Sequence, residues 1–344
     1  MNAQLILENG KRFSGKMFGA VKNVVGEVVF TTGMVGYQET LTDPSFAGQI
    51  VAMTFPLIGN YGINFEDMEA ERVSLTAFIV REKCDYPSNF RTEMTLDAFL
   101  KQQGVVGLEG IDTRELTRTL RDFGCMKGVI MQGEPTDDEV NKLMATLDNS
   151  DVVMKNTTKE KYTVNAGATK KAAVIDMGAK SSVISNLTDR DFSVSVFPAN
   201  TSAKEILAQN PDLVFVSNGP GNPLDAMQTV ETVKELIGKV YVTGVCMGHQ
   251  IIGLALGAKI EKLKFGHHGA NQPVKDLTNG NVFITSQNHN YIVTDLPKNV
   301  CQTFINVNDG TCEGLENKTL GVKSVQFNPN ATDVIDIGYL FDRV

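Results

Sequence analysis

The chain has 344 residues and a formal net charge of −8, with 32 Lys and Arg against 40 Asp and Glu. This length suffices for two domains that each bury a core. The acidic balance argues against nucleic acid and anionic membranes as partners, and no apolar run approaches membrane length. Five scattered cysteines are typical of reduced thiols, so we expect a cytoplasmic protein with no nucleic-acid or membrane partner.

The first 150 residues predict a small, β-rich α/β domain. Short apolar runs such as GEVVFTTG and QIVAMTF are broken by glycine turns, which is typical of strands. Helical patterns follow at 96–103 and 112–124, and a third begins near Asp137. From 151 to 171 the composition turns polar (KNTTKEKYTVNAGATKK), which predicts a linker between residues 1–150 and 172–344.

After Lys171 the chain alternates between strand and helix patterns: AAVIDM, SSVISNL, FSVSVF, SAKEILAQN, DLVFVSNG and AMQTVETVKELIG. Such alternation predicts a doubly wound α/β fold, with a mostly parallel sheet and helices on both faces. Ligands of these folds bind at the carboxyl ends of the strands. The segments 217–223 and 245–250 both follow strand ends, so we expect them to line one crevice.

The most informative motif is KVYVTGVCMGHQIIGLALG at 239–257. A strand that turns into a helix through G-x-C-x-G predicts a nucleophile elbow, in which glycines permit the tight turn. The motif places Cys246 at a helix N-terminus, where the dipole favours thiolate. Most free cysteines are merely small buried hydrophobes, but this context favours a nucleophile.

The loop SNGPGNP at 217–223 is a second candidate feature. It is either a simple strand-ending turn or a set of exposed backbone N–H groups suited to an oxyanion hole. Its pairing with the elbow favours the oxyanion hole.

The four histidines are His249, His267, His268 and His289, all in the second half. His267 and His268 are adjacent but have no acidic or Cys neighbours, which makes a poor metal motif. Structural or ligand-orienting roles are favoured for all four. We therefore expect no metal in this chain.

These motifs resemble a known family along nearly the whole chain. SNGPGNP, GVCMGHQ and GVKSVQFNPNA resemble a class I glutamine amidotransferase domain. GEVVFTTGMVGYQETLTDPSFAGQIV, FPLIGNYGIN and GLEGIDTRELTR resemble the N-terminal domain of the small subunit of glutamine-dependent carbamoyl-phosphate synthetase, and FGHHGANQPVKD and SQNHNY also fit that subunit.

The resemblance implies that the chain hydrolyses L-glutamine and passes ammonia to a large subunit. That partner combines ammonia with bicarbonate to make carbamoyl phosphate for arginine and pyrimidine synthesis, so we expect a heterodimer. ATP and Mg are expected on the large subunit and no cofactor in this chain. Cys246 matches the nucleophile, and the positions matching the oxyanion and glutamine contacts are Ser45, Gly219, Gly221, Met247, Gln250, Asn288, Asn290 and Tyr291.

The chain departs from the family pattern at three places. Asn290 and Tyr291 stand where the family usually has Gly and Phe. The tail motif, usually ending H-P-E-A, reads Asn328-Pro-Asn330-Ala, so the general base and its orienting carboxylate are both amides. A Pro/Gly-rich stretch is replaced by TDVIDIGYLFDRV, and the chain ends within the family's last helix.

Two interpretations therefore stand side by side. The intact elbow favours a glutamine-hydrolysing subunit, whose turnover is reduced because Asn cannot carry a proton from thiol to leaving ammonia. The two amides favour a non-catalytic scaffold or glutamine-sensing subunit of an ammonia-dependent synthetase.

Overall fold

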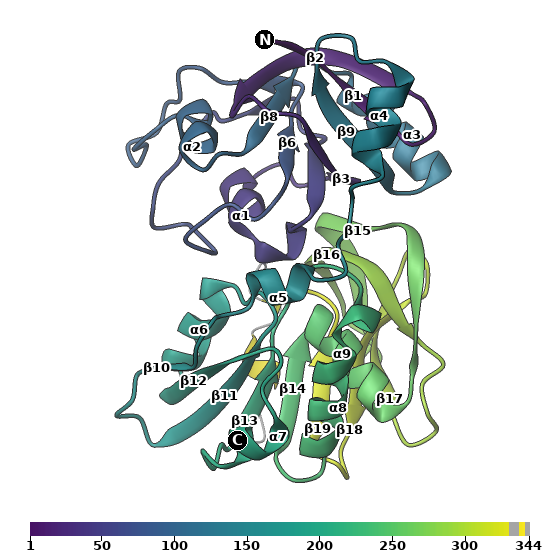
Figure 1. The fold of residues 1–344 in the computed structure, drawn as a ribbon. Coiled ribbons are helices and arrows are strands. Elements are labelled where there is room, and N and C mark those ends of the chain that lie inside the picture. Colours follow the sequence, from purple (N-terminus) through teal and green to yellow (C-terminus); the bar gives the residue numbers. More distant parts are fainter. Residues whose placement is uncertain (330–336, 341–344) are drawn as a thin grey trace. The chain divides into compact units, whose positions relative to one another are not determined.

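The structure is a computed structural model that describes residues 1–329 and 337–340 (Figure 1). The chain divides into two compact units, Met1–Asn149 and Ser150–Val344. The predicted linker at 151–171 is not an open connection. It contains helix α5 and strand β10, and β10 pairs with β12 of the second unit. Polar composition suggested a linker because β10 is an exposed edge strand with little apolar surface to bury.

The first unit is built around a closed barrel with strand order β1-β2-β8-β6-β4-β3-β9, and β9 pairs back onto β1. The neighbours from β3 through β4 and β6 to β8 are parallel, whereas the other pairs are antiparallel. Its elements are β1 (Asn2–Leu7), β2 (Arg12–Gly19), β3 (Val24–Thr31), α1 (Tyr37–Thr42), η1 (Pro44–Phe46), β4 (Gln49–Met53), β5 (Leu57–Ile58), β6 (Ala77–Ile79), β7 (Glu82–Lys83), α2 (Leu96–Gln102), β8 (Val106–Glu109), α3 (Thr113–Phe123), β9 (Met126–Gln132) and α4 (Asp137–Met144).

The three helices expected in this unit are confirmed. Each begins after a side chain that accepts a hydrogen bond from a backbone N–H of the first turn: Thr95 for α2, Asp112 for α3 and Thr136 for α4. Thr136 and Glu139 form a reciprocal capping box. The local sequence therefore determines where these helices start.

The second unit contains a mixed ten-stranded sheet with the order β10-β12-β11-β13-β14-β19-β18-β17-β15-β16. The strands from β12 to β19 in that order are parallel, as predicted, and helices cover the sheet. Its elements are α5 (Val152–Asn156), β10 (Tyr162–Val164), β11 (Lys170–Asp176), α6 (Ser181–Thr188), β12 (Phe192–Pro198), α7 (Ala203–Leu207), β13 (Leu213–Val216), η2 (Pro223–Ala226), α8 (Met227–Leu236), β14 (Tyr241–Val245), α9 (Met247–Leu256), β15 (Lys259–Asp276), β16 (Val282–Thr294), β17 (Cys301–Asn306), β18 (Cys312–Asn317), β19 (Val322–Val325) and η4 (Ile337–Leu340).

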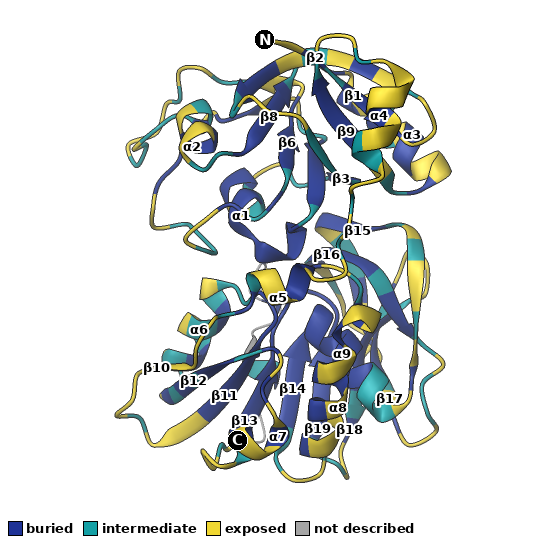
Figure 2. Ribbon diagram, in the orientation of Figure 1, coloured by how far each residue is buried: buried dark blue, intermediate teal, exposed yellow. Residues whose placement is uncertain are grey.

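The parallel strands bury both of their faces. Along β11, Ala173 and Ile175 belong to one apolar cluster, while Ala172 and Val174 belong to another on the opposite face. Figure 2 shows the central strands β13 and β14 as buried; β13 is buried along its whole length, and β14 is buried except at its first residue, Tyr241. This two-sided burial explains why these strands read as continuous apolar runs.

The antiparallel half of the sheet extends the parallel half beyond β19. Its largest feature is the long pair β15 and β16, whose register shifts between Lys262 and His267 and again between Gly269 and Gln272. Among the described residues, no helix is both long and apolar enough to cross a membrane.

Candidate active site

Cys246 lies at the turn between β14 and α9. The residue has φ of +53° and ψ of −112°, a backbone conformation that side-chain-bearing residues rarely adopt. Its backbone N–H donates to the Val325 carbonyl of β19 at 3.0 Å, and its carbonyl accepts from Gln250 of α9 at 3.2 Å. The strained turn is therefore held from both sides, as a nucleophile elbow requires.

The two glycines of the elbow are required by close packing. A Cβ on Gly248 would lie 2.0 Å from the Val216 carbonyl oxygen, and one on Gly244 would lie 2.8 Å from the same atom. Helix α9 can thus approach β13 only without side chains at these positions. The G-x-C-x-G motif is explained by sterics at both ends.

The loop after β13 lies at the same edge of the sheet as Cys246. Val216 at the end of β13 pairs in parallel with Gly244 of β14, so both chains leave the sheet at their carboxyl ends there. Gly219 packs so tightly that a Cβ would meet the Met177 carbonyl oxygen at 2.4 Å, and Gly221 has φ of +89°. The expected crevice-lining segments are therefore neighbours.

Strand β16 contacts Cys246 through its backbone and carries polar side chains next to that contact. The Cys246 thiol lies 3.5 Å from the Asn288 carbonyl oxygen. The side-chain oxygens of Asn288 and Asn290 lie 2.6 and 2.9 Å from the two ring nitrogens of His268. The Asn288 Nδ2 is buried and has no hydrogen-bond partner among the described residues. A donor of this kind is suited to a bound ligand.

Gln250 and Met247 of α9 were both predicted as site residues, but the first is held by side-chain hydrogen bonds and the second is packed in the core. The Gln250 side-chain NH₂ donates to the Tyr291 carbonyl at 2.7 Å and to the Gln326 Oε1 at 3.1 Å. The Met247 side chain packs in the hydrophobic core, so what it offers at the site is its backbone N–H at the helix start. Gln326 was not among the predicted residues, although it lies two residues before Asn328 in the same motif.

Asn328 lies at the site through its backbone. Its N–H donates to the Ser286 carbonyl at 2.9 Å, which forms an isolated bridge to β16 two residues before Asn288. It follows β19, the strand that pairs in parallel with β14. The structure therefore brings residue 328 to the same strand that contacts Cys246.

Two of the predicted site residues remain predictions. Asn330 lies outside the described residues. Ser45 belongs to the first unit, in η1, where it is buried and its N–H donates to the Asp43 carboxylate at 2.9 Å.

Two of the histidines are buried and neutral. Burial lowers the pKa of His249 to about 3, and its Nδ1 lies 2.9 Å from the Ser324 hydroxyl. Burial also lowers the pKa of His289 well below its usual value, helped by the nearby rings of His267 and His268. These values fit the structural or ligand-orienting roles expected for the histidines.

His267 differs from the other histidines. Although burial opposes its charge, hydrogen bonds and charges from Glu313 and Asp309 raise its pKa above the usual value. Its Nε2 lies 2.8 Å from Asp309 Oδ2, and its Nδ1 lies 3.5 Å from Glu313 Oε1. His267 has no acidic neighbour along the chain, but the fold supplies Asp309 from the loop between β17 and β18 and Glu313 from β18.

Comparison with known proteins identifies both halves of the chain. Residues 5–130 match the model of the carbamoyl-phosphate synthase small chain, CPSase domain, and residues 173–342 match that of the class-I glutamine amidotransferases. The carbamoyl phosphate synthase small chain of Clostridium perfringens (strain 13 / Type A) is 52% identical, over 100% of this chain and 98% of that protein.

Two more distant relatives match along the same length. The carbamoyl phosphate synthase small chain of Archaeoglobus fulgidus is 46% identical, over 100% of this chain and 98% of that protein. The carbamoyl phosphate synthase pyrimidine-specific small chain of Bacillus subtilis (strain 168) is 44% identical, over 100% of this chain and 95% of that protein.

Proposed function

This chain belongs to the family of carbamoyl phosphate synthase small chains, and we propose that it is a glutamine amidotransferase subunit with slow turnover. It binds L-glutamine, releases ammonia and delivers it to a large subunit. That partner uses ATP to make carbamoyl phosphate from bicarbonate, in the cytoplasm, for arginine or pyrimidine synthesis. The observation that carries the proposal is the strained elbow that holds Cys246 between β14 and α9.

The chemistry begins at sulfur. The Cys246 thiolate attacks the γ-carboxamide carbon of glutamine, the C–N bond breaks, and a γ-glutamyl thioester remains as ammonia leaves. Water then cleaves the thioester to glutamate. The developing oxyanion is stabilised by backbone N–H groups, for which Met247 at the helix start and the Gly219–Gly221 loop are the candidates.

Substrate recognition is assigned to β16 and its neighbours. The unpartnered Asn288 Nδ2 donates to the substrate, and Gln250 holds the Tyr291 backbone in place. His268 orients Asn288 and Asn290 together. Ser45 is a further glutamine contact from the first unit, by its match to the family motif.

The slow turnover is assigned to Asn328 and Asn330. An amide can donate or accept a hydrogen bond, but it does not take up a proton near neutral pH. No side chain at these positions then delivers a proton to the departing nitrogen or takes one from the attacking water, so both protons must be exchanged with solvent water, which is slow. Loss of a general acid–base costs roughly 10²–10⁴-fold in rate, while oxyanion and binding contributions remain.

A non-catalytic role is the alternative, favoured by Asn328 at the position of the family's base. The chain would then act as a scaffold or glutamine sensor for a large subunit that takes ammonia from solution.

Glutamate release from glutamine, measured with and without the large subunit, distinguishes the two functions. The proposed function expects slow glutamate release that depends on Cys246 and a covalent adduct of glutamyl mass on that residue. Release and adduct both at the level of a Cys246→Ala control would establish the alternative. Turnover at an ordinary enzymatic rate would contradict the assignment of slow turnover to the amides.

A further inference from the structure

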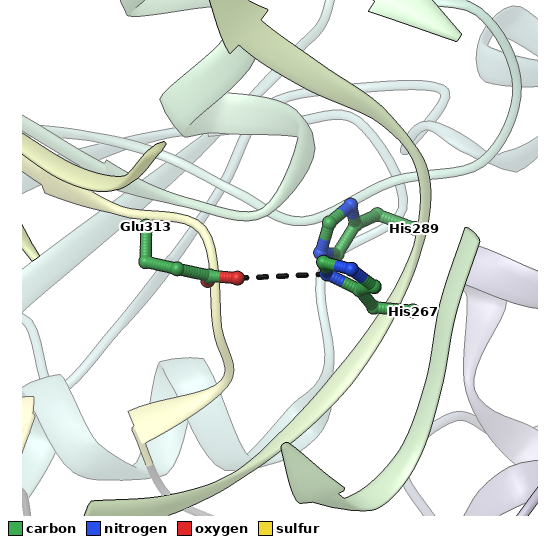
Figure 3. Close-up of side chains that lie close together, drawn as sticks. All are labelled: His267, His289 and Glu313. Atoms are coloured by element: carbon green, nitrogen blue, oxygen red, sulfur yellow. Dashed lines mark ion pairs between the residues drawn. The ribbon is translucent and has the colours of Figure 1, made fainter. Parts of the chain in front are cut away.

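Three buried side chains from three strands converge in the antiparallel half of the sheet: His267 of β15, His289 of β16 and Glu313 of β18 (Figure 3). His267 and His289 are register partners across β15 and β16. One potential ligand atom from each residue lies within 4.8 Å of the others. Among the described residues, this is the one group of three or more His, Cys, Asp or Glu side chains arranged in this way.

The interior of the cluster has more acceptors than donors. His289 Nδ1 lies 2.9 Å from the Tyr291 carbonyl oxygen, which can only accept, so Nδ1 carries the proton and Nε2 presents a lone pair. That Nε2 lies 3.0 Å from Gln287 Oε1, which is another acceptor. Glu313 is fully buried, and its Oε2 has no hydrogen-bond partner among the described residues.

The orientation of the Gln287 amide is fixed by its neighbours. Its NH₂ donates to the Thr285 hydroxyl at 3.1 Å. That hydroxyl donates its own proton to the Gln272 carbonyl at 3.0 Å, so it can only accept from Gln287. The Oε1 therefore faces the two histidines, 3.0 Å from His267 Nδ1 as well. The Gln287 Oε1, the His289 Nε2 and the Glu313 carboxylate thus all point lone pairs into one buried space, and such an arrangement is suited to a bound cation.

We propose that His267 Nδ1, His289 Nε2 and the Glu313 carboxylate bind one Zn²⁺, with Gln287 Oε1 as the fourth ligand. Tetrahedral zinc at about 2.0–2.2 Å from N and O ligands places those ligand atoms roughly 3.3–3.5 Å apart. Gln287 Oε1 lies 3.0 Å from each imidazole nitrogen, and His267 Nδ1 lies 3.5 Å from Glu313 Oε1. The ligand atoms of His267, His289 and Glu313 all lie within 4.8 Å of one another, so metal binding draws the more separated atoms inward. Imidazole ligands favour zinc over Mg²⁺ or Ca²⁺, which prefer oxygen.

The outward-facing atoms of the ligands support this assignment. With its Nδ1 on the metal, His267 donates from Nε2 to Asp309 Oδ2 at 2.8 Å, an arrangement typical of zinc-bound histidine. His289 donates from Nδ1 to the Tyr291 carbonyl, and Glu313 Oε1 accepts from Asn306 Nδ2 at 3.2 Å. Each of these ligands therefore has a partner that fixes its orientation.

Four protein ligands leave no open position, so the zinc is structural. It joins β15, β16 and β18 on the face of β16 that carries Gln287 and His289. Asn288 and Asn290 alternate onto the other face, where they contact His268. The metal thus fixes the strand that carries the candidate glutamine contacts, without taking part in the chemistry at Cys246. The inference does not depend on the proposed function.

The test is metal binding by the full chain after unfolding and refolding with Zn²⁺ or Co²⁺, since a buried site is loaded as the chain folds. We expect one Zn²⁺ per chain, raised thermal stability, and the visible absorption of tetrahedral Co²⁺ without thiolate charge-transfer bands. Glu313→Gln lowers zinc affinity by more than about 100-fold, and Asp309→Asn by about 10–100-fold. The control variant is His268→Gln, because His268 is buried and follows His267 on β15. We expect this variant to retain the metal.

Four results would overturn the proposal: a refolded wild-type chain without bound zinc, cobalt spectra with thiolate or octahedral character, unchanged affinity in Glu313→Gln, or metal loss in the His268→Gln control. The first two need no variant, so the proposal is decided even if Glu313→Gln fails to fold. If either of the first two results is obtained, His267, His289, Gln287 and Glu313 form a hydrogen-bonded network that holds a proton in place of a metal.

Discussion

The elbow at 244–248 and the tail segment at 326–329 reach the same edge of the sheet but differ in what they retain. At the elbow, the strained backbone, the close glycine packing and the start of helix α9 together fix the position of the buried Cys246 sulfur, and all three features are present. In the tail segment the backbone of Asn328 is bridged to β16, yet its side chain cannot titrate. Under the proposed function, the fold keeps its catalytic geometry without the proton-transfer chemistry, because sterics and proton transfer depend on different atoms.

The largest effect is expected from restoring the missing chemistry. Asn328→His combined with Asn330→Glu should raise glutamate release by about 10²–10⁴-fold in the presence of the large subunit. Asn330→Glu alone should change little, because a carboxylate without an imidazole has nothing to orient. A steady-state assay of both variants checks this, and a single Asn330→Glu variant as fast as the double variant would show that another base operates.

Damage to the elbow should cost stability. Gly248→Ala places a Cβ 2.0 Å from the Val216 carbonyl, so helix α9 must shift, and we expect a loss of about 3 kcal/mol in urea unfolding. Gly167→Ala is the matched control in the same unit, because no atom lies within 4 Å of its Cβ position. Equal unfolding midpoints for the two variants would contradict the packing argument.

Acid should weaken the second unit through His249. Its folded pKa of about 3 lies below its ordinary value, so the unfolded chain takes up the proton first. The stabilising contribution is present above about pH 6.5 and is lost as pH falls toward 3, by about 1.4 kcal/mol per pH unit. The difference between wild type and His249→Asn, measured by unfolding across pH 4–7, isolates this slope; parallel curves would argue against it.

The smallest effect is expected at the thiols themselves. Glutamine at saturation should slow iodoacetamide labelling of Cys246 by about tenfold and leave the exposed Cys301 unaffected. Peptide mass mapping after timed labelling measures both cysteines in one sample. Equal rates with and without glutamine would indicate that no ligand occupies the space beside Cys246.

The sequence predicted the features that depend on short stretches of chain. Strand–helix alternation gave the parallel sheet, and capping residues such as Asp112 gave helix starts, because both follow from local periodicity and hydrogen bonding. The elbow was recognisable for the same reason. Its two glycines lie within five residues of sequence, and both are needed because a Cβ at either position would collide with the Val216 carbonyl oxygen.

Features that depend on pairing between distant segments were not predictable. Glu313 reaches His267 only because β17 and β18 extend the sheet between β19 and β15. In the sequence alone, therefore, no acidic residue could be assigned to the histidines. The barrel closure of β9 onto β1 is equally non-local. The segment 151–171, predicted as a linker, also contains β10, whose place comes from pairing with β12 and not from apolar content.

One backbone oxygen contacts both helix α9, which follows Cys246, and the buried cluster of His267, His289 and Glu313. The Tyr291 carbonyl accepts from Gln250 at 2.7 Å and faces His289 Nδ1 at 2.9 Å, so both of its lone pairs are used. The position of the main chain at residue 291 therefore matters both to helix α9 and to His289. A one-residue insertion in β16 would displace this carbonyl and disconnect helix α9 from the buried cluster in a single step.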